Sequence, residues 1–161
     1  MRLVILPLFV GFSLLFTACV TQPYLKEHPA LIIFKTPTFK YADMGFLYEN
    51  KEEVKVEIYG AGQAIMALKI SNTHVCMSLF ECMSKDSFNA RVLSDLYPTD
   101  ILEHIFRGKK IWNGQGLKQK RDGFTQHITK KGKYNIYYSV LNNKITFHDK
   151  MNTILIKVKK Q

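Results

Sequence analysis

The chain has 161 residues, of which 47% are hydrophobic, 12% aromatic and 22% charged. This composition is typical of one folded domain with a single core, and it excludes a disordered or low-complexity protein. The formal net charge of +10 favours an acidic partner, such as phospholipid headgroups, lipopolysaccharide phosphates or other proteins. A basic surface that is merely solvated would fit the same charge.

The N-terminal residues have the pattern of an export signal. Arg2 supplies a positive charge, an apolar run follows from Leu3 to Phe16, and Thr17-Ala18-Cys19 closes it. The run is shorter than the roughly 20 residues that span a bilayer, so it predicts a cleaved signal over residues 1–18. A small residue directly before cysteine resembles the bacterial lipobox, which implies a lipid anchor on Cys19. An ordinary signal with an incidental cysteine is the alternative.

Cleavage would leave a short tether over residues 19–29 and a single domain over residues 30–161. The tether contains two prolines and no periodic pattern. Loss of Arg2 with the signal leaves 22 basic against 13 acidic residues, an excess of +9. An exported chain is not expected to bind nucleic acid.

Two cysteines remain if Cys19 carries lipid. In an oxidising compartment this even number favours a disulfide between Cys76 and Cys82, although two buried free thiols stay possible. His74 adds an H-x-C-x5-C pattern. Two thiols and one imidazole lack the fourth ligand of a structural zinc site, so no metal and no cofactor are expected.

Alternation of apolar and polar residues predicts most of the chain as strands. The clearest example is residues 54–70, where two alternating segments flank Gly60-Ala61-Gly62, a connection suited to a hairpin because glycine reaches positive φ. Asn142-Asn143 predicts a second tight hairpin. The other predicted strands are residues 31–34, 38–41, 45–49, 73–79, 124–130, 134–140, 144–148 and 154–159.

Two helices interrupt this series. Phe88, Val92 and Leu96 have helical spacing within residues 86–97, with Ser84 or Asp86 as the N-cap. A shorter helix is predicted between Asp100 as N-cap and Gly108 as the closing glycine.

The basic segment from Lys109 to Gly123 is predicted to be a long, mobile loop that Ile111 and Trp112 anchor. It would be either a membrane or partner contact or a solvated linker.

These elements predict an α+β fold: one curved antiparallel sheet of ten to eleven strands, forming a half-open barrel with two to three short helices over its concave side. An apolar face of this length must curl or be covered, and short helices cover only part of it. The remainder would be a cavity for a hydrophobic guest. A filled barrel without a guest would show the same pattern.

The order of elements resembles the LolB family of outer-membrane lipoprotein receptors. The strand Gly45-Phe46-Leu47-Tyr48, the hairpin of residues 54–70, the proline-led helix PTDILEHIFRG and the closing strands from Gly123 to Lys159 carry the resemblance. It implies a monomer on the periplasmic face of the bacterial outer membrane. Such a protein accepts acylated lipoproteins from a periplasmic carrier protein and makes or breaks no bond.

The resemblance also implies two sites. The membrane-delivery loop would be Gly60, Ala61 and Gly62, where Ala61 replaces an exposed leucine of the family; Phe46-Leu47 is an alternative apolar tip. The residues expected to line the acyl-binding cavity, for which ordinary core is the competing interpretation, are Val54, Val56, Ile58, Met66, Leu68, Ile70, Tyr134, Ile136, Tyr138, Ile145 and Phe147.

Two other classes of function remain open. A structural or interaction lipoprotein with a filled core would bind a partner through Lys109, Lys110, Lys118 and Lys120. An enzyme is not expected, and no catalytic residue is assigned, because the histidines at 28, 74, 104, 127 and 148 have no spacing that joins a nucleophile to a base.

Overall fold

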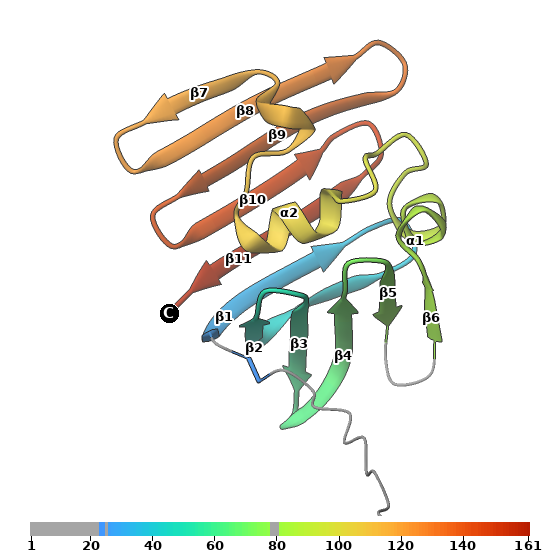
Figure 1. The fold of residues 1–161 in the computed structure, drawn as a ribbon, viewed down its shortest axis with the longest axis vertical. Helices are drawn as coiled ribbons and strands as arrows, with labels where there is room; N and C mark the ends of the chain where they lie inside the picture. The colour runs from blue at the N-terminus through green and yellow to red at the C-terminus, as the bar shows by residue number, and fades with distance from the viewer. Residues whose placement is uncertain (1–22, 25, 78–80) are drawn as a thin grey trace, which may run out of the picture.

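The computed structural model describes residues 23, 24, 26–77 and 81–161 (Figure 1). These residues form a single antiparallel sheet of eleven strands with two α-helices. Within this part of the chain, no helix is both long and apolar enough to cross a membrane. The predicted signal of residues 1–18 and the predicted lipid attachment at Cys19 lie outside the described residues.

The strands are β1 (Lys26–Lys35), β2 (Lys40–Glu49), β3 (Val54–Gly60), β4 (Gln63–Ile70), β5 (His74–Met77), β6 (Glu81–Ser84), β7 (Leu117–Lys120), β8 (Gly123–Lys130), β9 (Tyr134–Leu141), β10 (Lys144–Asp149) and β11 (Ile154–Lys160). The helices are α1 (Lys85–Val92) and α2 (Ile101–Arg107), followed by the 3₁₀ turn η1 (Trp112–Gly114).

The two ends of the chain meet in the middle of the sheet. The strand order is β6-β5-β4-β3-β2-β1-β11-β10-β9-β8-β7, so β1 pairs with β11 and the edges β6 and β7 do not pair with each other. The sheet is therefore open. Residues 85–116, which we call the covering segment, lead from one edge to the other and carry both helices across one face (Figure 1).

The sheet curves around α2. This helix contacts both β3 and β10, although three other strands lie between them. Neighbouring strands are about 4.8 Å apart, so a flat sheet would separate β3 and β10 by roughly 19 Å, more than the 10–12 Å width of a helix. The predicted single, curved antiparallel sheet is thus confirmed. We call the face under the helices the inner face and the opposite one the outer face.

The domain begins earlier than the sequence predicted. Lys26 to Pro29 belong to β1 and pair with β2, so the predicted tether over residues 19–29 is too long. Pro29 is tolerated because the ladder to β11 starts only at the pair Ala30–Lys160, and the Pro29 carbonyl accepts a hydrogen bond from the Gln161 N–H at 2.9 Å.

Three further predicted elements had wrong bounds. The separate strands over residues 38–41 and 45–49 are one strand, β2, which passes straight through Gly45. The helix predicted over residues 86–97 ends at Val92, because Leu93 leaves helical geometry and Leu96 is exposed. The short strand β6 was not predicted, since its sequence ECMS shows no clear alternation.

The caps and turns follow the sequence more closely. The Ser84 hydroxyl accepts a hydrogen bond from the Ser87 N–H and caps α1, and Gly108 ends α2 at φ +65°, as predicted. Asp100 makes no capping bond; its carboxylate lies 3.3 Å from His104 Nε2 instead. The β3–β4 turn consists of Ala61 and Gly62, both at positive φ, rather than three residues.

The long loop predicted over residues 109–123 is wrong in its second half. Residues 117–120 form the edge strand β7, and residues 112–114 form η1. Ile111 does anchor this region, because its side chain is fully buried.

Gly45 marks a close backbone approach within the sheet. A Cβ at this position would lie 1.9 Å from the Glu57 carbonyl oxygen on β3. We expect Gly45→Ala to lower the free energy of unfolding by about 3 kcal/mol, because the strands must separate. Gly62→Ala is the control: no atom lies within 4 Å of its added Cβ, and only the strain of positive φ, about 1 kcal/mol, is expected. Urea unfolding measures both; equal losses would contradict the steric explanation.

Cys76 and Cys82 form a disulfide between β5 and β6, where they are directly paired and their Cα atoms are 3.9 Å apart. The disulfide lies at the edge of the sheet and closes a short loop. Replacing both cysteines by serine is expected to lower the free energy of unfolding by about 2 kcal/mol, mainly by freeing the unfolded chain. Reduction of the wild type should cause the same loss in thermal unfolding, and a variant as stable as the oxidised wild type would contradict this expectation.

Candidate lipid-binding face and its covering segment

The residues predicted to line an acyl cavity all lie together on the inner face. They come from β3, β4, β9 and β10 and project toward the covering segment, as alternation requires. Tyr134 is the most exposed of them, at 9%. The set is Val54, Val56, Ile58, Met66, Leu68, Ile70, Tyr134, Ile136, Tyr138, Ile145 and Phe147.

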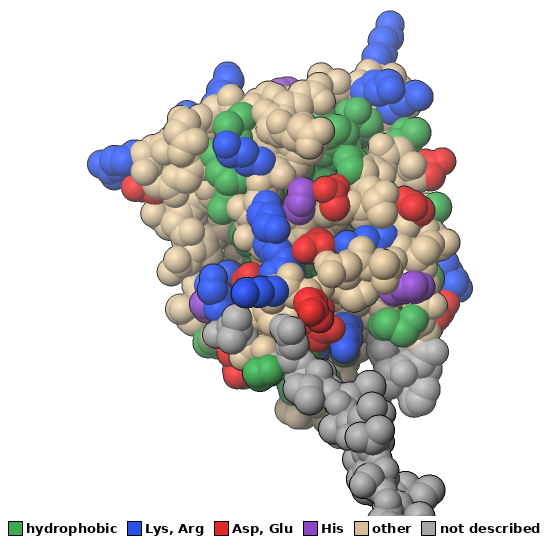
Figure 2. Space-filling view, viewed as in Figure 1, with side chains coloured by type: hydrophobic (Ala, Val, Ile, Leu, Met, Phe, Trp, Pro, Cys, Tyr) green, Lys and Arg blue, Asp and Glu red, His purple; other side chains and the backbone are tan. Residues whose placement is uncertain are grey.

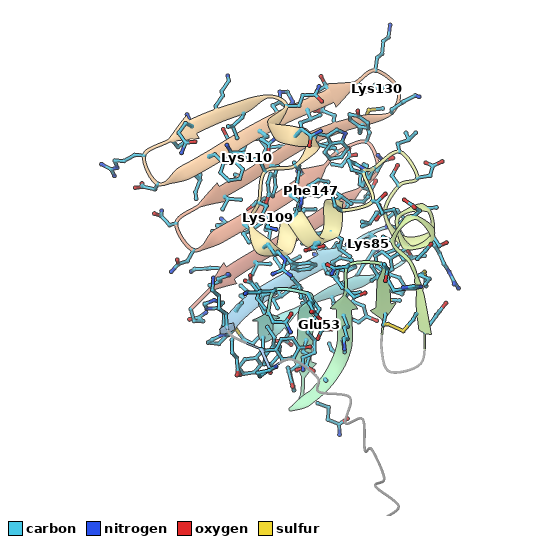
Figure 3. All side chains as sticks on the ribbon, in the orientation of Figure 1. Glu53, Lys85, Lys109, Lys110, Lys130 and Phe147 are labelled. Atoms are coloured by element: carbon cyan, nitrogen blue, oxygen red, sulfur yellow. A yellow bond between two sulfur atoms is a disulfide. The ribbon has the colours of Figure 1, made fainter. Side chains whose placement is uncertain are left out.

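The covering segment fills the space above this face. Figure 3 places Phe147 of β10 next to α2, and the Phe106 ring of α2 stacks against Phe34 of β1 with centroids 6.5 Å apart. The inner face is therefore covered in this structure rather than open to solvent. The buried apolar residues of the covering segment are Phe88, Val92, Tyr97, Ile101, Leu102, Ile105, Phe106 and Ile111.

An aromatic cluster attaches the loop between α1 and α2 to the sheet. The Tyr97 ring packs edge-on against Trp112 at 5.5 Å and Phe147 at 5.9 Å, and Trp112 lies 5.5 Å from Tyr134. Such pairs contribute about 0.5–1.5 kcal/mol each beyond the area they bury. The sequence identified Trp112 as an anchor but not Tyr97 and Tyr134, the two rings against which it packs.

A hydrogen bond from Tyr97 fastens this cluster to β10. The Tyr97 hydroxyl donates to Asp149 Oδ2 at 2.5 Å, and Asp149 also accepts from the Asn135 N–H, the Met151 N–H and the Asn152 amide. Burial would raise the pKa of Asp149, but these hydrogen bonds lower it below its ordinary value. Burial and the bond to Asp149 raise the pKa of Tyr97, which therefore stays a neutral donor.

Gln126 holds the other end of the covering segment. Its amide, fully buried on β8, donates to the carbonyls of Ile111 and Gln115 at 2.8 Å and accepts from the Ile111 N–H at 2.9 Å. The Tyr138 hydroxyl donates to the Lys109 carbonyl at 3.0 Å, and burial raises the pKa of Tyr138. The sequence analysis missed Gln126. The signal for it was a polar residue at a position that alternation places on the inner face, between Phe124 and Ile128.

A buried ionic cluster joins the two helices. Lys85 of α1 lies 2.8 Å from Glu103 of α2, and the other Glu103 oxygen accepts from Arg107 Nε at 3.0 Å. The side chains of Lys85, Arg107 and Glu103 are 7%, 11% and 14% exposed. Burial would raise the pKa of Glu103, but its two cationic neighbours lower it below the ordinary value.

Arg107 also connects α2 to the sheet. Its Nη1 donates to the Asn50 carbonyl at 2.8 Å and lies 3.8 Å from Glu49 at the end of β2, which is paired with Lys160 of β11 at 3.2 Å. Its Nη2 is buried and has no hydrogen-bond partner among the described residues. A buried donor without a partner is costly, so this contact holds the helix less firmly than it could.

In the predicted delivery loop Ala61 and Gly62 are exposed and Gly60 is partly exposed, but the loop itself offers little apolar surface. Ala61 presents only a methyl group. The alternative prediction, an apolar tip made of Phe46 and Leu47 together, is wrong. Leu47 is fully buried on the inner face, whereas Phe46 packs beside Tyr59 on the outer face. Of the residues named for delivery, those at the turn remain exposed.

The four lysines of the predicted basic loop do not form one patch. Lys118 and Lys120 project from β7 to the outer face, whereas Lys109 lines a separate hollow of about 360 Å³ with Arg107 and Lys26. Figure 2, viewed from the side of the helices, shows basic and acidic side chains intermingled over the covering segment.

The described residues contain no group of three or more histidine, cysteine or carboxylate side chains that could hold a metal ion. The comparisons with known proteins add no relative: neither the profiles of known protein families nor the curated proteins give a match to this chain.

Proposed function

We propose that this chain is a LolB-like receptor, anchored through Cys19 on the periplasmic face of the bacterial outer membrane. Its inner face would bind the acyl chains of lipoproteins that a periplasmic carrier delivers, and the curved sheet would act as a half-open barrel. One observation supports this most directly. Among the described residues, the apolar face of an open eleven-stranded sheet is covered only by an edge-to-edge segment whose helices have eight and seven residues.

Binding requires that the covering segment moves away from the sheet. Its apolar side chains and an acyl chain can replace one another, because hydrophobic contacts are non-directional. Burial of about ten methylenes at ~0.8 kcal/mol each would supply roughly 8 kcal/mol. Against this stand the loss of burial of the apolar side chains of the covering segment and the polar contacts at its margins, chiefly those of Asp149 and Gln126.

The test compares the transfer of lipoprotein to three proteins in which Cys19→Ala prevents lipidation. A triacylated lipoprotein loaded on its carrier is mixed with the protein that is otherwise wild type, with a Tyr97→Phe variant and with a Tyr137→Phe variant, and native mass spectrometry follows transfer. Tyr97→Phe removes one fastening of the covering segment, worth about 1.4 kcal/mol, and should speed transfer about 10-fold. Tyr137→Phe removes an exposed hydroxyl on the outer face and should change nothing.

The absence of transfer, while circular dichroism shows a folded sheet, would contradict this function. Transfer at the same rate in all three proteins would agree with the function but would contradict the proposed movement of the covering segment.

A non-catalytic interaction lipoprotein with a filled core is the second candidate. The observation that favours it is the burial of every predicted cavity residue to 9% exposure or less. Transfer of a lipoprotein separates the two candidates, because a filled core would accept none.

A further inference from the structure

The outer face of strands β7–β11 carries charge of one sign. Alternation and the strand pairing identify its outward positions, all of which are described. These positions contain lysines and histidines and no aspartate or glutamate. The basic residues are Lys118, Lys120, His127, Lys144, His148, Lys157 and Lys159. None of these lysines forms an ion pair with another described residue, so their charges are available to a partner.

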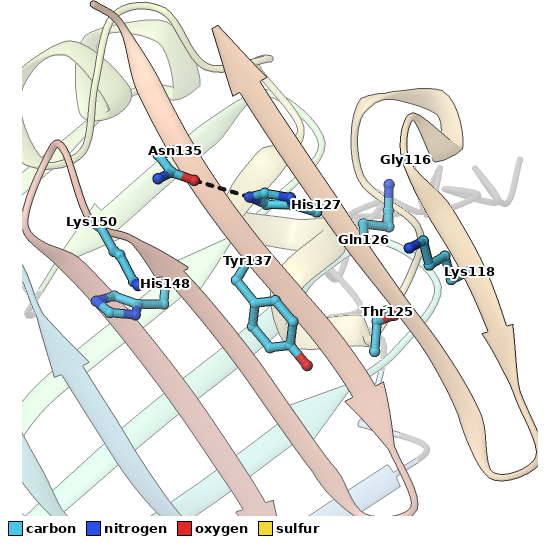
Figure 4. Close-up of a pocket in the computed structure, with 9 residues that line it drawn as sticks. All are labelled: Gly116, Lys118, Thr125, Gln126, His127, Asn135, Tyr137, His148 and Lys150. Carbon is cyan, nitrogen blue, oxygen red and sulfur yellow. Dashed lines mark hydrogen bonds between the residues drawn. The ribbon is translucent and has the colours of Figure 1, made fainter. Parts of the chain in front are cut away.

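This face is also hollowed. One hollow of about 620 Å³ runs across β7–β10, with Lys118 and Lys150 at opposite ends and Tyr137 between them (Figure 4). A second, of about 290 Å³, adjoins it at Tyr137 and is lined by Lys144 and Lys157. A third, of about 340 Å³, shares His148 and Lys150 with the first. The three hollows therefore form one continuous surface.

The side chains in these hollows combine charge, hydroxyls and one exposed ring. Tyr137 is 45% exposed, and His127 Nε2 lies 3.1 Å from the Asn135 side-chain oxygen beside it. Thr125 contributes a hydroxyl at the same hollow, and Lys118 and Lys150 contribute charge. An aromatic ring packs against the apolar face of a sugar, hydroxyl and amide groups bond its hydroxyls, and lysines pair with phosphate or sulfate esters.

We propose that the outer face of β7–β11 binds an anionic polysaccharide that carries phosphate or sulfate esters. Single-stranded nucleic acid fits less well, because such binders stack successive bases on several rings, and Tyr137 is the sole Phe, Tyr or Trp among these described outward positions. A bilayer surface fits less well because a chain can enter separate hollows and a planar headgroup layer cannot. This surface lies opposite the proposed acyl site and does not depend on it.

The first measurement uses fluorescein-labelled dextran sulfate and uncharged dextran of equal length. Fluorescence anisotropy of the full chain should show binding of dextran sulfate and none of dextran. Binding should weaken at least 10-fold between 50 and 200 mM salt, because each lysine contact releases a counterion.

Variants then locate the site. Lys118→Gln with Lys150→Gln removes the charges at both ends of the large hollow and should raise the dissociation constant about 10-fold. Lys109→Gln with Lys110→Gln removes the same net charge from the covering segment and should change it less than 2-fold. Tyr137→Ala leaves every charge in place and should weaken binding about 5-fold. All these side chains are at least partly exposed, so folding should be unaffected.

Several outcomes would overturn the proposal. Equal weakening by both lysine pairs would show that dextran sulfate binds to diffuse charge. An unchanged dissociation constant in Tyr137→Ala would show that the Tyr137 ring does not contact the sugar. Polyuridylate or phosphatidylglycerol vesicles that displace dextran sulfate at lower concentrations would identify a nucleic acid or a membrane as the better partner. Failure of lipoprotein transfer would not bear on this surface.

Discussion

Replacing Asp149 by alanine is expected to lower the free energy of unfolding by about 4 kcal/mol. Asp149 is fully buried and accepts hydrogen bonds from Tyr97, Asn135, Met151 and Asn152. A hydrogen bond to a charged group contributes about 1.5–3 kcal/mol, and each donor left buried without a partner costs more than its bond had contributed. Equilibrium unfolding in urea at pH 7 measures the loss.

The contribution of Asp149 should depend on pH in one direction. Its pKa in the folded protein lies below its ordinary value of 3.8, so the unfolded chain takes up a proton first as the pH falls. The stabilisation is therefore complete above about pH 5 and disappears as the pH falls through the lowered pKa. The difference between wild type and Asp149→Ala should be constant from pH 6 to 8 and should shrink below pH 4.

Asp122→Ala is the matched control, because among the described residues its carboxylate pairs only with the exposed Arg121. It should change the free energy of unfolding by less than about 0.5 kcal/mol. A loss from Asp149→Ala that stayed constant down to pH 2 would contradict the role of the ionised carboxylate. A loss equal to that of Asp122→Ala would contradict the importance of its buried bonds.

The inner face could be predicted from the sequence because it follows one local rule. Val54, Val56 and Ile58 alternate with polar residues, and period two assigns them to one face whatever their neighbours are. Alternation also gave the strands from β8 to β11 within a residue or two. It could not join residues 38–41 to 45–49, because Gly45 signals a turn locally but provides a close backbone approach to Glu57 in the folded sheet.

The contacts that hold the covering segment could not be predicted, because they depend on how distant segments cross. Lys85 and Glu103 lie 18 residues apart on two helices, and Tyr97 and Asp149 lie 52 residues apart. Neither pair has a characteristic spacing. Gln126 could have been singled out more easily, since it is a polar residue at a position of β8 where alternation predicts an apolar one.

The charge of the outer face was visible only in part. The net charge of +10 favours an acidic partner, but from the sequence alone the only segment that offers a contact is 109–123, for which a solvated linker is the alternative. The pairing of β7 with β8 and of β9 with β10 distributes the lysines otherwise: Lys118 joins Lys144 and Lys157 on one face, while Lys109 lies elsewhere. Register decides this, and a one-residue change in register would reverse every assignment.

Glu103→Ala is expected to lower the free energy of unfolding by about 4 kcal/mol. The carboxylate pairs with Lys85 and Arg107, which are only 7% and 11% exposed. Its removal leaves Lys85 without an ion-pair partner among the described residues and leaves Arg107 only the more distant Glu49, at 3.8 Å. Breaking a buried ion pair typically costs 3–5 kcal/mol, because the remaining charge stays desolvated. Arg107 already has one buried nitrogen without a hydrogen-bond partner among the described residues, so it cannot compensate easily.

Glu81→Ala provides a direct comparison, because it breaks an ion pair of similar length in which Glu81 and Arg91 are 50% and 67% exposed. Solvent screens that pair, so its loss should cost less than about 0.5 kcal/mol. A second comparison removes the charges together: Lys85→Met with Glu103→Leu should recover at least half of the loss, since the lysine no longer needs a partner. If the double variant were as unstable as Glu103→Ala, the cost would come from lost packing of α2, and the charges would not be its cause.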